Sequence, residues 1–92
     1  MKEKVIIITG AGSGVGRDCT KLFLQENWKV ALIGRREETL SQSASNHKNA
    51  MIIKCDVSSE SEVEVAFKSI QEKWERIDVL FNNAGVSGPP LP

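Results

Sequence analysis

A run of apolar, mostly β-branched residues from Val5 to Thr9 is followed at once by Gly10, Gly12, Gly14 and Gly16. Such a run predicts a strand buried on both faces, as in a parallel sheet. Glycine lacks a Cβ, so the backbone after the strand can take positive φ and lie against a ligand. A helical pattern begins at Gly14, and the N–H groups of a helix N-terminus carry partial positive charge. The segment therefore predicts a strand, a turn that cradles a phosphate, and a helix. The alternative is a glycine-rich turn that binds no ligand.

The rest of the chain continues the alternation of strand and helix. Further strands are predicted at 30–33, 51–53 and 79–81, and helices at 14–27, at 35–44 and from the capping box Ser59-x-x-Glu62 onward. Stacked βαβ units with right-handed crossovers follow from this order. We therefore predict an α/β fold. It is the N-terminal half of a Rossmann-type doubly wound parallel sheet, with strand order 3-2-1-4 and residues 1–92 as a single, truncated domain.

Apolar residues at helical spacing predict which face each helix buries. The predicted faces are Val15, Cys19, Leu22 and Phe23 in the first helix, Leu40 and Ala44 in the second, and Val63, Ala66, Phe67, Ile70 and Trp74 in the third.

Charge and composition restrict the partners. The 92 residues include 12 Lys and Arg and 12 Asp and Glu, so no basic excess points to nucleic acid or to an anionic membrane. No segment approaches the about 20 apolar residues of a membrane helix, and we expect a cytoplasmic protein. Cys19 and Cys55 have no Cys or His partner at ligand spacing, so we expect free thiols and no metal site.

The spacing of the glycines excludes two common phosphate-binding motifs. The fingerprint G-x-G-x-x-G would need glycine in place of Val15 or Arg17, and the Walker A motif would need a Gly-Lys pair followed by Ser or Thr. The pattern present is Thr9-Gly10-x-x-x-Gly14-x-Gly16.

This pattern resembles the cofactor loop of the short-chain dehydrogenase/reductase family in its one-domain form. Asp56-Val57, after the third predicted strand, resembles the adenine-contacting pair of that family. The segment Asn82-Asn83-Ala84-Gly85, after the fourth, resembles its Asn-Asn-Ala-Gly motif. The three motifs follow the family's order, and each stands at the carboxyl end of a predicted strand, where α/β sheets bind ligands.

The resemblance implies a nicotinamide dinucleotide site. Within the loop of Gly10 and Gly12, the backbone of Ser13, Gly14 and Val15 would hold the pyrophosphate and the nearby ribose. Gly16 would let the helix pack closely on the sheet.

Further along the chain, the resemblance implies that the Asp56 carboxylate would accept a hydrogen bond from the adenine amino group, beside the Val57 backbone. Asn82 and the backbone of Ala84 and Gly85 would line the adenosine-ribose and nicotinamide side. The alternatives are a helix or turn cap for Asp56 and a plain turn for 82–85.

The end of the second predicted strand favours NADP over NAD. An acidic residue there binds the ribose 2′-OH of NAD, whereas an arginine suits the 2′-phosphate of NADP. The residues are Gly34, Arg35 and Arg36. Glu37 and Glu38 follow, and the alternative role for one of them is the acidic partner of NAD. They lie beyond the strand end, so we expect them to stabilise the first turn of a helix. The alternative is that both arginines belong to a solvated helix start.

No catalytic residue is assigned. The family's chemistry rests on a Tyr-x-x-x-Lys pair with an upstream Ser and Asn, and this chain contains no tyrosine. His47, alone in a polar loop, is expected to be solvated.

The resemblance implies an NAD(P)-dependent oxidoreductase that transfers a hydride between NADP(H) and a carbonyl or alcohol substrate. The chain would be its cofactor-binding half, inactive alone, and the full-length form would be a homo-oligomer. The alternatives are a non-catalytic dinucleotide-binding module and an epimerase or dehydratase on the same fold. The strand at 79–81 would leave an apolar sheet edge exposed. We therefore expect 92 residues alone to be weakly stable, or to be part of a longer protein.

Overall fold

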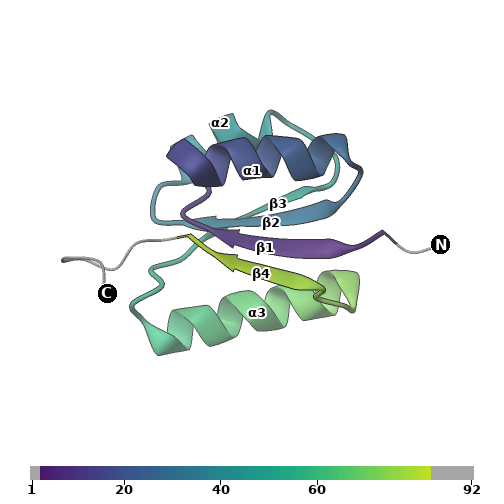
Figure 1. The fold of residues 1–92 in the computed structure, drawn as a ribbon. Helices are drawn as coiled ribbons and strands as arrows, with labels where there is room; N and C mark the ends of the chain where they lie inside the picture. Colours follow the sequence, from purple (N-terminus) through teal and green to yellow (C-terminus); the bar gives the residue numbers. More distant parts are fainter. Residues whose placement is uncertain (1–2, 84–92) are drawn as a thin grey trace, which may run out of the picture.

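The computed structural model describes residues 3–83, which form a parallel sheet between two layers of helices (Figure 1). The elements are β1 (Val5–Thr9), α1 (Gly14–Gln25), β2 (Lys29–Gly34), α2 (Glu37–Ala44), β3 (Ala50–Lys54), α3 (Glu60–Trp74) and β4 (Val79–Asn82). The sheet order is β3-β2-β1-β4, with every pair parallel. The predicted fold class and strand order are confirmed.

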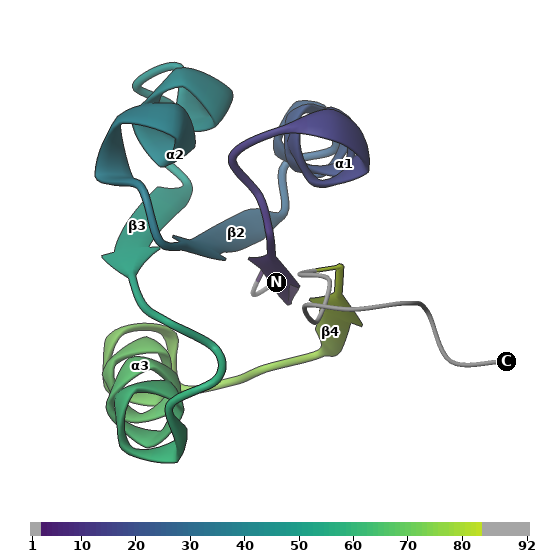
Figure 2. The ribbon, with the colours of Figure 1, turned by 90° about the vertical axis from the view of Figure 1, so that its left-hand side faces the viewer.

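The helices lie on opposite faces of the sheet. Figure 2 looks along the strands and shows α1 and α2 on one side and α3 on the other. In the register of the sheet, Ile7 of β1 lies beside Ala31 of β2 and Leu80 of β4. Because all four strands run the same way, their carboxyl ends, and the segments that leave them, meet at one edge of the sheet.

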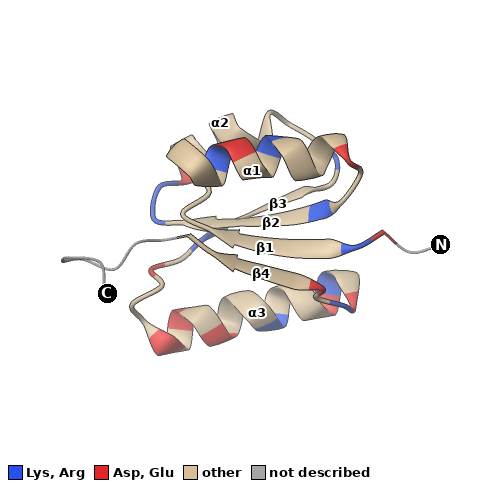
Figure 3. Cartoon of the chain, viewed as in Figure 1, with Lys and Arg blue, Asp and Glu red and all other residues tan. Residues whose placement is uncertain are grey.

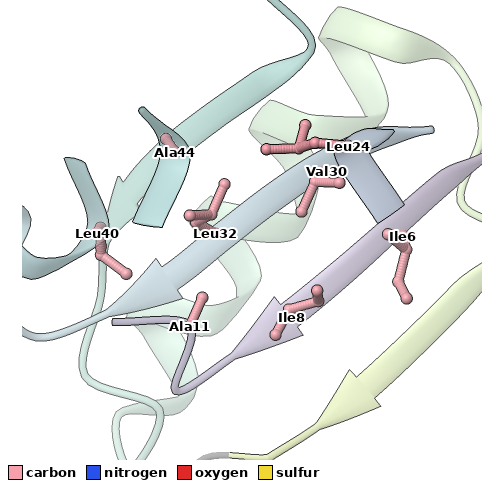
Figure 4. Packing of buried hydrophobic residues seen from close by; sticks show 8 residues of the cluster. All are labelled: Ile6, Ile8, Ala11, Leu24, Val30, Leu32, Leu40 and Ala44. Carbon is pink, nitrogen blue, oxygen red and sulfur yellow. The ribbon is translucent and has the colours of Figure 1, made fainter. Parts of the chain in front are cut away.

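Every residue of β1 is buried, as expected for a strand covered on both faces. Alternate residues of β1 and β2 point to opposite faces and enter two separate cores. Figure 4 shows the core on the α1 and α2 side, formed by Ile6, Ile8, Ala11, Leu24, Val30, Leu32, Leu40 and Ala44. The core on the α3 side contains Val5, Ile7, Ala31, Ile33, Cys55, Ala66 and Ile70.

The buried face of α1 differs from the prediction. Val15 is 59% exposed and Leu22 is 54% exposed, whereas Cys19 and Phe23 pack at the border of the core. The buried residues of the helix are Gly16, Thr20 and Leu24. The close approach of Gly16 to the preceding turn sets the rotation of the helix about its axis. The Thr20 hydroxyl enters the core at low cost because it donates to the Gly16 carbonyl at 2.8 Å.

The other two helices bury the faces that were predicted. In α2, Leu40 and Ala44 are buried, and the helix begins at Glu37, so that both predicted glutamates lie in its first turn. In α3, Ala66 and Ile70 are buried. The remaining residues of the predicted α3 face, Val63, Phe67 and Trp74, pack against the same core.

The predicted capping box of α3 forms in part. The Ser59 hydroxyl accepts a hydrogen bond from the Glu62 N–H at 3.4 Å. The Ser59 N–H donates to the Asp56 carbonyl at 2.9 Å, so the Glu62 carboxylate accepts instead from the Asp56 N–H, also at 2.9 Å. The start of α3 is thereby tied to the end of β3.

Among the helices in residues 3–83, none has the length and apolar character to cross a membrane.

Candidate dinucleotide-binding site

The turn between β1 and α1 requires glycine at three points. Gly10 and Gly14 have φ of 64° and 56°, in the left-handed region that L side chains rarely adopt. A Cβ at Gly16 would overlap the Gly10 carbonyl oxygen and lie 2.9 Å from Nδ2 of Asn83. Only glycine therefore lets α1 start this close to the turn.

Three donors hold the carbonyl groups of the turn. Asn83 Nδ2 donates to Gly10 O at 3.3 Å, Ser43 Oγ to Ala11 O at 2.7 Å and Arg17 Nη2 to Gly12 O at 2.6 Å. Sequence reasoning missed Arg17 and Ser43 as contributors to the site, and it gave no separate role to Asn83 of the Asn-Asn-Ala-Gly motif. No local pattern marks Arg17 or Ser43, because each reaches the turn from a helix, α1 for Arg17 and α2 for Ser43.

Asn82 and Thr9 join the ends of β4 and β1. The two residues lie side by side in the sheet register, and the Thr9 hydroxyl donates to Asn82 Oδ1 at 3.0 Å. Asn82 is thus placed beside the glycine turn, at the carboxyl edge of the sheet. Ala84 and Gly85, the other predicted residues of this segment, lie outside the described residues.

A hollow of about 380 Å³ opens between the glycine turn and the start of α2. Its lining consists of Gly10, Gly12, Ser13, Gly34, Arg35, Arg36, Thr39 and Leu40. Figure 3 shows the segment between β2 and α2 in blue, because Arg35 and Arg36 follow one another there. The hollow therefore combines residues of the predicted phosphate loop with two arginine residues.

Asp56 caps the turn that leads into α3. Its Oδ1 accepts from the Ser58 N–H at 3.0 Å and from the Ser58 hydroxyl at 2.7 Å. These bonds, and then the positive charge of Arg35, hold the pKa of Asp56 below its ordinary value. Arg35 Nε lies 4.0 Å from Oδ1, and the Arg35 side chain is 73% exposed. The turn-cap alternative is thus realised, and the carboxylate also lies beside the basic segment.

A second, smaller hollow of about 130 Å³ lies at the same edge on the α3 side. Its lining consists of Thr9, Ile33, Cys55, Val57, Val63, Phe67, Leu80 and Asn82. Val57 and Asn82, predicted from separate motifs, meet here. Burial, followed by the charges of Glu62 and Asp56, raises the pKa of the Cys55 thiol, so Cys55 is protonated at neutral pH and is a poor nucleophile.

His47 lies away from these hollows. It is half-buried, and its Nδ1 accepts a hydrogen bond from the Asn49 N–H at 3.1 Å. His47 was expected to be a solvated surface residue, and it is instead half-buried because its ring accepts a bond within the turn before β3. Cys19 and Cys55 are both free thiols. Within residues 3–83, no cluster of three or more His, Cys, Asp and Glu has a metal-binding arrangement.

The predicted site residues that the structure describes gather at one edge of the sheet. The glycine turn follows β1, Arg35 and Arg36 follow β2, Asp56 and Val57 follow β3, and Asn82 ends β4. Four segments that are separate in sequence therefore lie along the carboxyl ends of the strands, around two neighbouring hollows, and the arrangement can hold an extended ligand with phosphate groups.

Comparison with known proteins finds the same architecture. The family model described as short chain dehydrogenase matches residues 4–91. The chain is 41% identical to short-chain dehydrogenase reductase 3c of Arabidopsis thaliana, over 97% of this chain and 35% of that protein.

Two solved structures with bound nucleotides are also similar. One is a variant actinorhodin polyketide ketoreductase with NADPH, with a TM-score of 0.85 and 32% identity over 96% of this chain and 36% of that one. The other is 3-ketoacyl-(acyl-carrier-protein) reductase from Brucella melitensis complexed with NADH. Its TM-score is 0.81, with 31% identity over 86% of this chain and 33% of that one. The chain thus spans about a third of the length of these relatives.

Proposed function

The chain belongs to the short-chain dehydrogenase family, and on this premise we propose that it forms the nucleotide-binding part of an oxidoreductase. The reaction that we propose is hydride transfer between NADP(H) and a carbonyl or alcohol substrate. The observation that carries the proposal is the hollow in which the glycine turn faces the basic segment after β2. Backbone N–H groups at the start of α1 suit a pyrophosphate, and guanidinium groups suit a further phosphate.

The residues at the end of β2 support NADP as the preferred cofactor. Gly34 leaves no carboxylate to repel a 2′-phosphate, and the next two residues are Arg35 and Arg36. Glu37 and Glu38 lie in the first turn of α2, where acidic residues stabilise a helix. One of the two similar solved structures holds NADPH and the other NADH, so the choice proposed for this chain rests on its own residues.

The remaining residues fit the other parts of a dinucleotide. Ser58 and Arg35 interact with Oδ1 of Asp56, so Oδ2 is the oxygen that we propose for an adenine amino group, with the Val57 backbone beside it. We propose that Asn82, with Ala84 and Gly85, lines the ribose and nicotinamide side. A bound cofactor would supply the hydride, and the residues of this chain would bind and orient it. No residue of this chain is proposed as a catalyst.

The test is a comparison of NADPH and NADH binding by the protein and its Arg35→Ala variant, followed by nucleotide fluorescence. We expect NADPH to bind more tightly than NADH. We expect Arg35→Ala to weaken NADPH about tenfold or more, because a charged hydrogen bond to phosphate is lost, and to leave NADH nearly unchanged. Lys48→Ala is the control, because Lys48 is an exposed cation before β3, at the opposite end of the sheet.

Tighter binding of NADH, or an Arg35→Ala variant with undiminished NADPH affinity, would contradict the preference for NADP. This chain is expected to be inactive alone, so the assay of activity uses a full-length protein that includes it. A full-length protein that binds NADPH but exchanges no hydride with any of a panel of carbonyl and alcohol substrates would instead favour a non-catalytic binding module.

A further inference from the structure

Two side chains outside the predicted motifs, Arg17 and Ser43, form hydrogen bonds to the backbone of the glycine turn. Arg17 of α1 donates from Nη2 to Gly12 O at 2.6 Å and from Nε to Ser43 Oγ at 3.1 Å. Ser43 of α2 is fully buried and donates to Ala11 O at 2.7 Å. Arg17 Nη2 also lies 3.3 Å from Oε1 of Gln42. The guanidinium therefore bridges the turn and α2.

These bonds determine which way the peptide groups of the turn point. A trans peptide is planar, and its C=O and N–H bonds point in opposite directions. The Ala11 carbonyl shares its peptide with the Gly12 N–H, and the Gly12 carbonyl shares its peptide with the Ser13 N–H. Because Ser43 and Arg17 draw both carbonyls toward the interface of α1 and α2, both N–H groups point away from that interface.

The same bonds reduce the repulsion between the carbonyl oxygens of the turn and a bound phosphate. Carbonyl oxygens carry partial negative charge and repel a phosphate, whereas N–H groups attract it. The carbonyls of Gly10, Ala11 and Gly12 all accept from protein donors, namely Asn83, Ser43 and Arg17. The carbonyls of Ala11 and Gly12 are thus held by donors from α2 and α1, and the N–H groups of the same two peptides belong to Gly12 and Ser13, which line the hollow.

We propose that Arg17, supported by Ser43, is a positioning residue that orients the Gly12 and Ser13 peptide groups toward the pyrophosphate of the cofactor. This inference rests on the proposed function, because it assumes that the hollow binds a dinucleotide. The pyrophosphate is common to NADPH and NADH, so Arg17 sets the affinity for both nucleotides by the same factor. Arg35, by contrast, distinguishes them.

The test measures the binding of three ligands by the protein and by Arg17→Met, which keeps an unbranched side chain but lacks the guanidinium. NADPH and NADH both contain the pyrophosphate, and 2′-AMP does not. We expect Arg17→Met to weaken NADPH and NADH equally, about tenfold, as for loss of a charged hydrogen bond. We expect 2′-AMP affinity to stay within about twofold, because no pyrophosphate interaction exists to be lost.

Three further variants make the test specific. Arg17→Lys should restore only part of the affinity, because one ammonium cannot reproduce the fork that reaches Gly12 and Ser43 together. Ser43→Ala should weaken both nucleotides by one smaller factor, and its effect should not add to that of Arg17→Met. Lys21→Met, on an exposed position of the same helix, is the control and should bind as the wild type does.

The outcomes separate this inference from the proposed function. If Arg17→Met lowers the melting temperature but leaves both affinities unchanged, the residue is structural only and the inference is wrong. Loss of NADPH affinity alone would place Arg17 at the 2′-phosphate and would also overturn it. If Arg17→Met does not fold, unchanged affinities in Ser43→Ala would overturn it as well. A wild-type protein that binds neither nucleotide would contradict the proposed function itself.

Discussion

At the scale of single residues, Asp78 joins the two ends of the chain that the structure describes. Its Oδ2 accepts from the Val5 N–H at 2.7 Å, and its own N–H donates to the Val5 carbonyl at 2.9 Å. Arg76 donates to both carboxylate oxygens, at 2.9 Å and 2.6 Å. These bonds favour the charged form, first through Arg76 and then through Val5, and they hold the pKa of Asp78 below its ordinary value.

This pKa shift predicts how stability depends on pH. Unfolding returns the pKa of Asp78 to about 3.8, above its value in the folded state. The stabilisation is therefore complete well above pH 4 and is lost as the pH falls through the folded value. We expect the melting temperature of Asp78→Asn to fall less than that of the wild type between pH 6 and pH 3. Asp18→Asn, at an exposed position on α1, is the control. Parallel melting curves for wild type and Asp78→Asn would contradict the prediction.

The site residues show how far inference from single motifs extends. Arg35 and Asp56 were predicted from separate motifs for the 2′-phosphate and for adenine, yet their side chains lie 4.0 Å apart. The pairing could not be predicted from sequence, because it depends on β2 and β3 being neighbours in the sheet with Gly34 beside Lys54. The identity of each residue indicated its chemistry, and the sheet register decided which residues meet.

At the scale of elements, the start of α3 depends on a cap that the sequence predicted. Ser59 has extended backbone dihedrals, and its hydroxyl accepts from the Glu62 N–H. Such a cap satisfies one of the N–H groups that have no partner within the helix. Because Ser59 follows β3 by a short loop, its cap also sets where α3 begins beneath the sheet.

We expect Ser59→Ala to lower the free energy of unfolding by roughly 0.5–1 kcal/mol, at the lower end for N-caps because the bond is long. Ser59→Asp should retain most of the stability, since a carboxylate also caps and interacts favourably with the helix dipole. The measurement is urea denaturation followed by circular dichroism. Ser69→Ala, the same change at a half-buried position within α3, removes only a hydroxyl bond to the Val65 carbonyl and should cost little, because alanine favours helix interiors. Equal losses for the two alanine variants would rule out a specific role for the cap.

The first helix shows why periodicity alone can select the wrong face. The stripe of Val15 and Leu22 is apolar, but the helix turns Gly16 and Thr20 toward the interior instead. A buried face predicted from the spacing of apolar residues takes no account of a position, such as Gly16, where no side chain fits. The helix instead takes the rotation that places Gly16 against the Gly10 carbonyl, and Val15 and Leu22 remain exposed as a result.

At the scale of the whole molecule, β3 and β4 are the two outer strands of the sheet, each paired with a neighbour on one side only. In β4, Val79 is 40% exposed and Leu80 is 49% exposed, so the predicted exposure of this apolar edge is confirmed. An edge strand offers unpaired backbone groups, and exposed apolar side chains beside them favour pairing with another chain.

We therefore expect a protein of these 92 residues to self-associate as its concentration rises, measured by size-exclusion chromatography with light scattering. Leu80→Lys should reduce this association, because an edge lysine opposes strand pairing. Val65→Lys, at an exposed apolar position on α3, is the matched control and should associate as the wild type does. A monomer at every concentration, or equal effects of the two lysine variants, would contradict a role for the β4 edge.

The sequence by itself determined the features that depend on neighbours along the chain. The apolar run before the glycines defined β1, the glycine spacing defined the turn, and Ser59 defined the start of α3. The alternation of these elements then led to the parallel order of the sheet, because right-handed crossovers leave few alternatives.

Only the tertiary structure decided which distant residues act together. The bond between Arg17 and Ser43 spans 26 positions of sequence, and the bond between Asn83 and Gly10 spans 73. The rotation of α1 depends on the same turn. No local pattern encodes these contacts, because each follows from how closely two packed elements approach. The residues proposed to bind a nucleotide could thus be predicted from motifs in the chain, whereas the packing of α1 and α2 decided how the glycine turn is held.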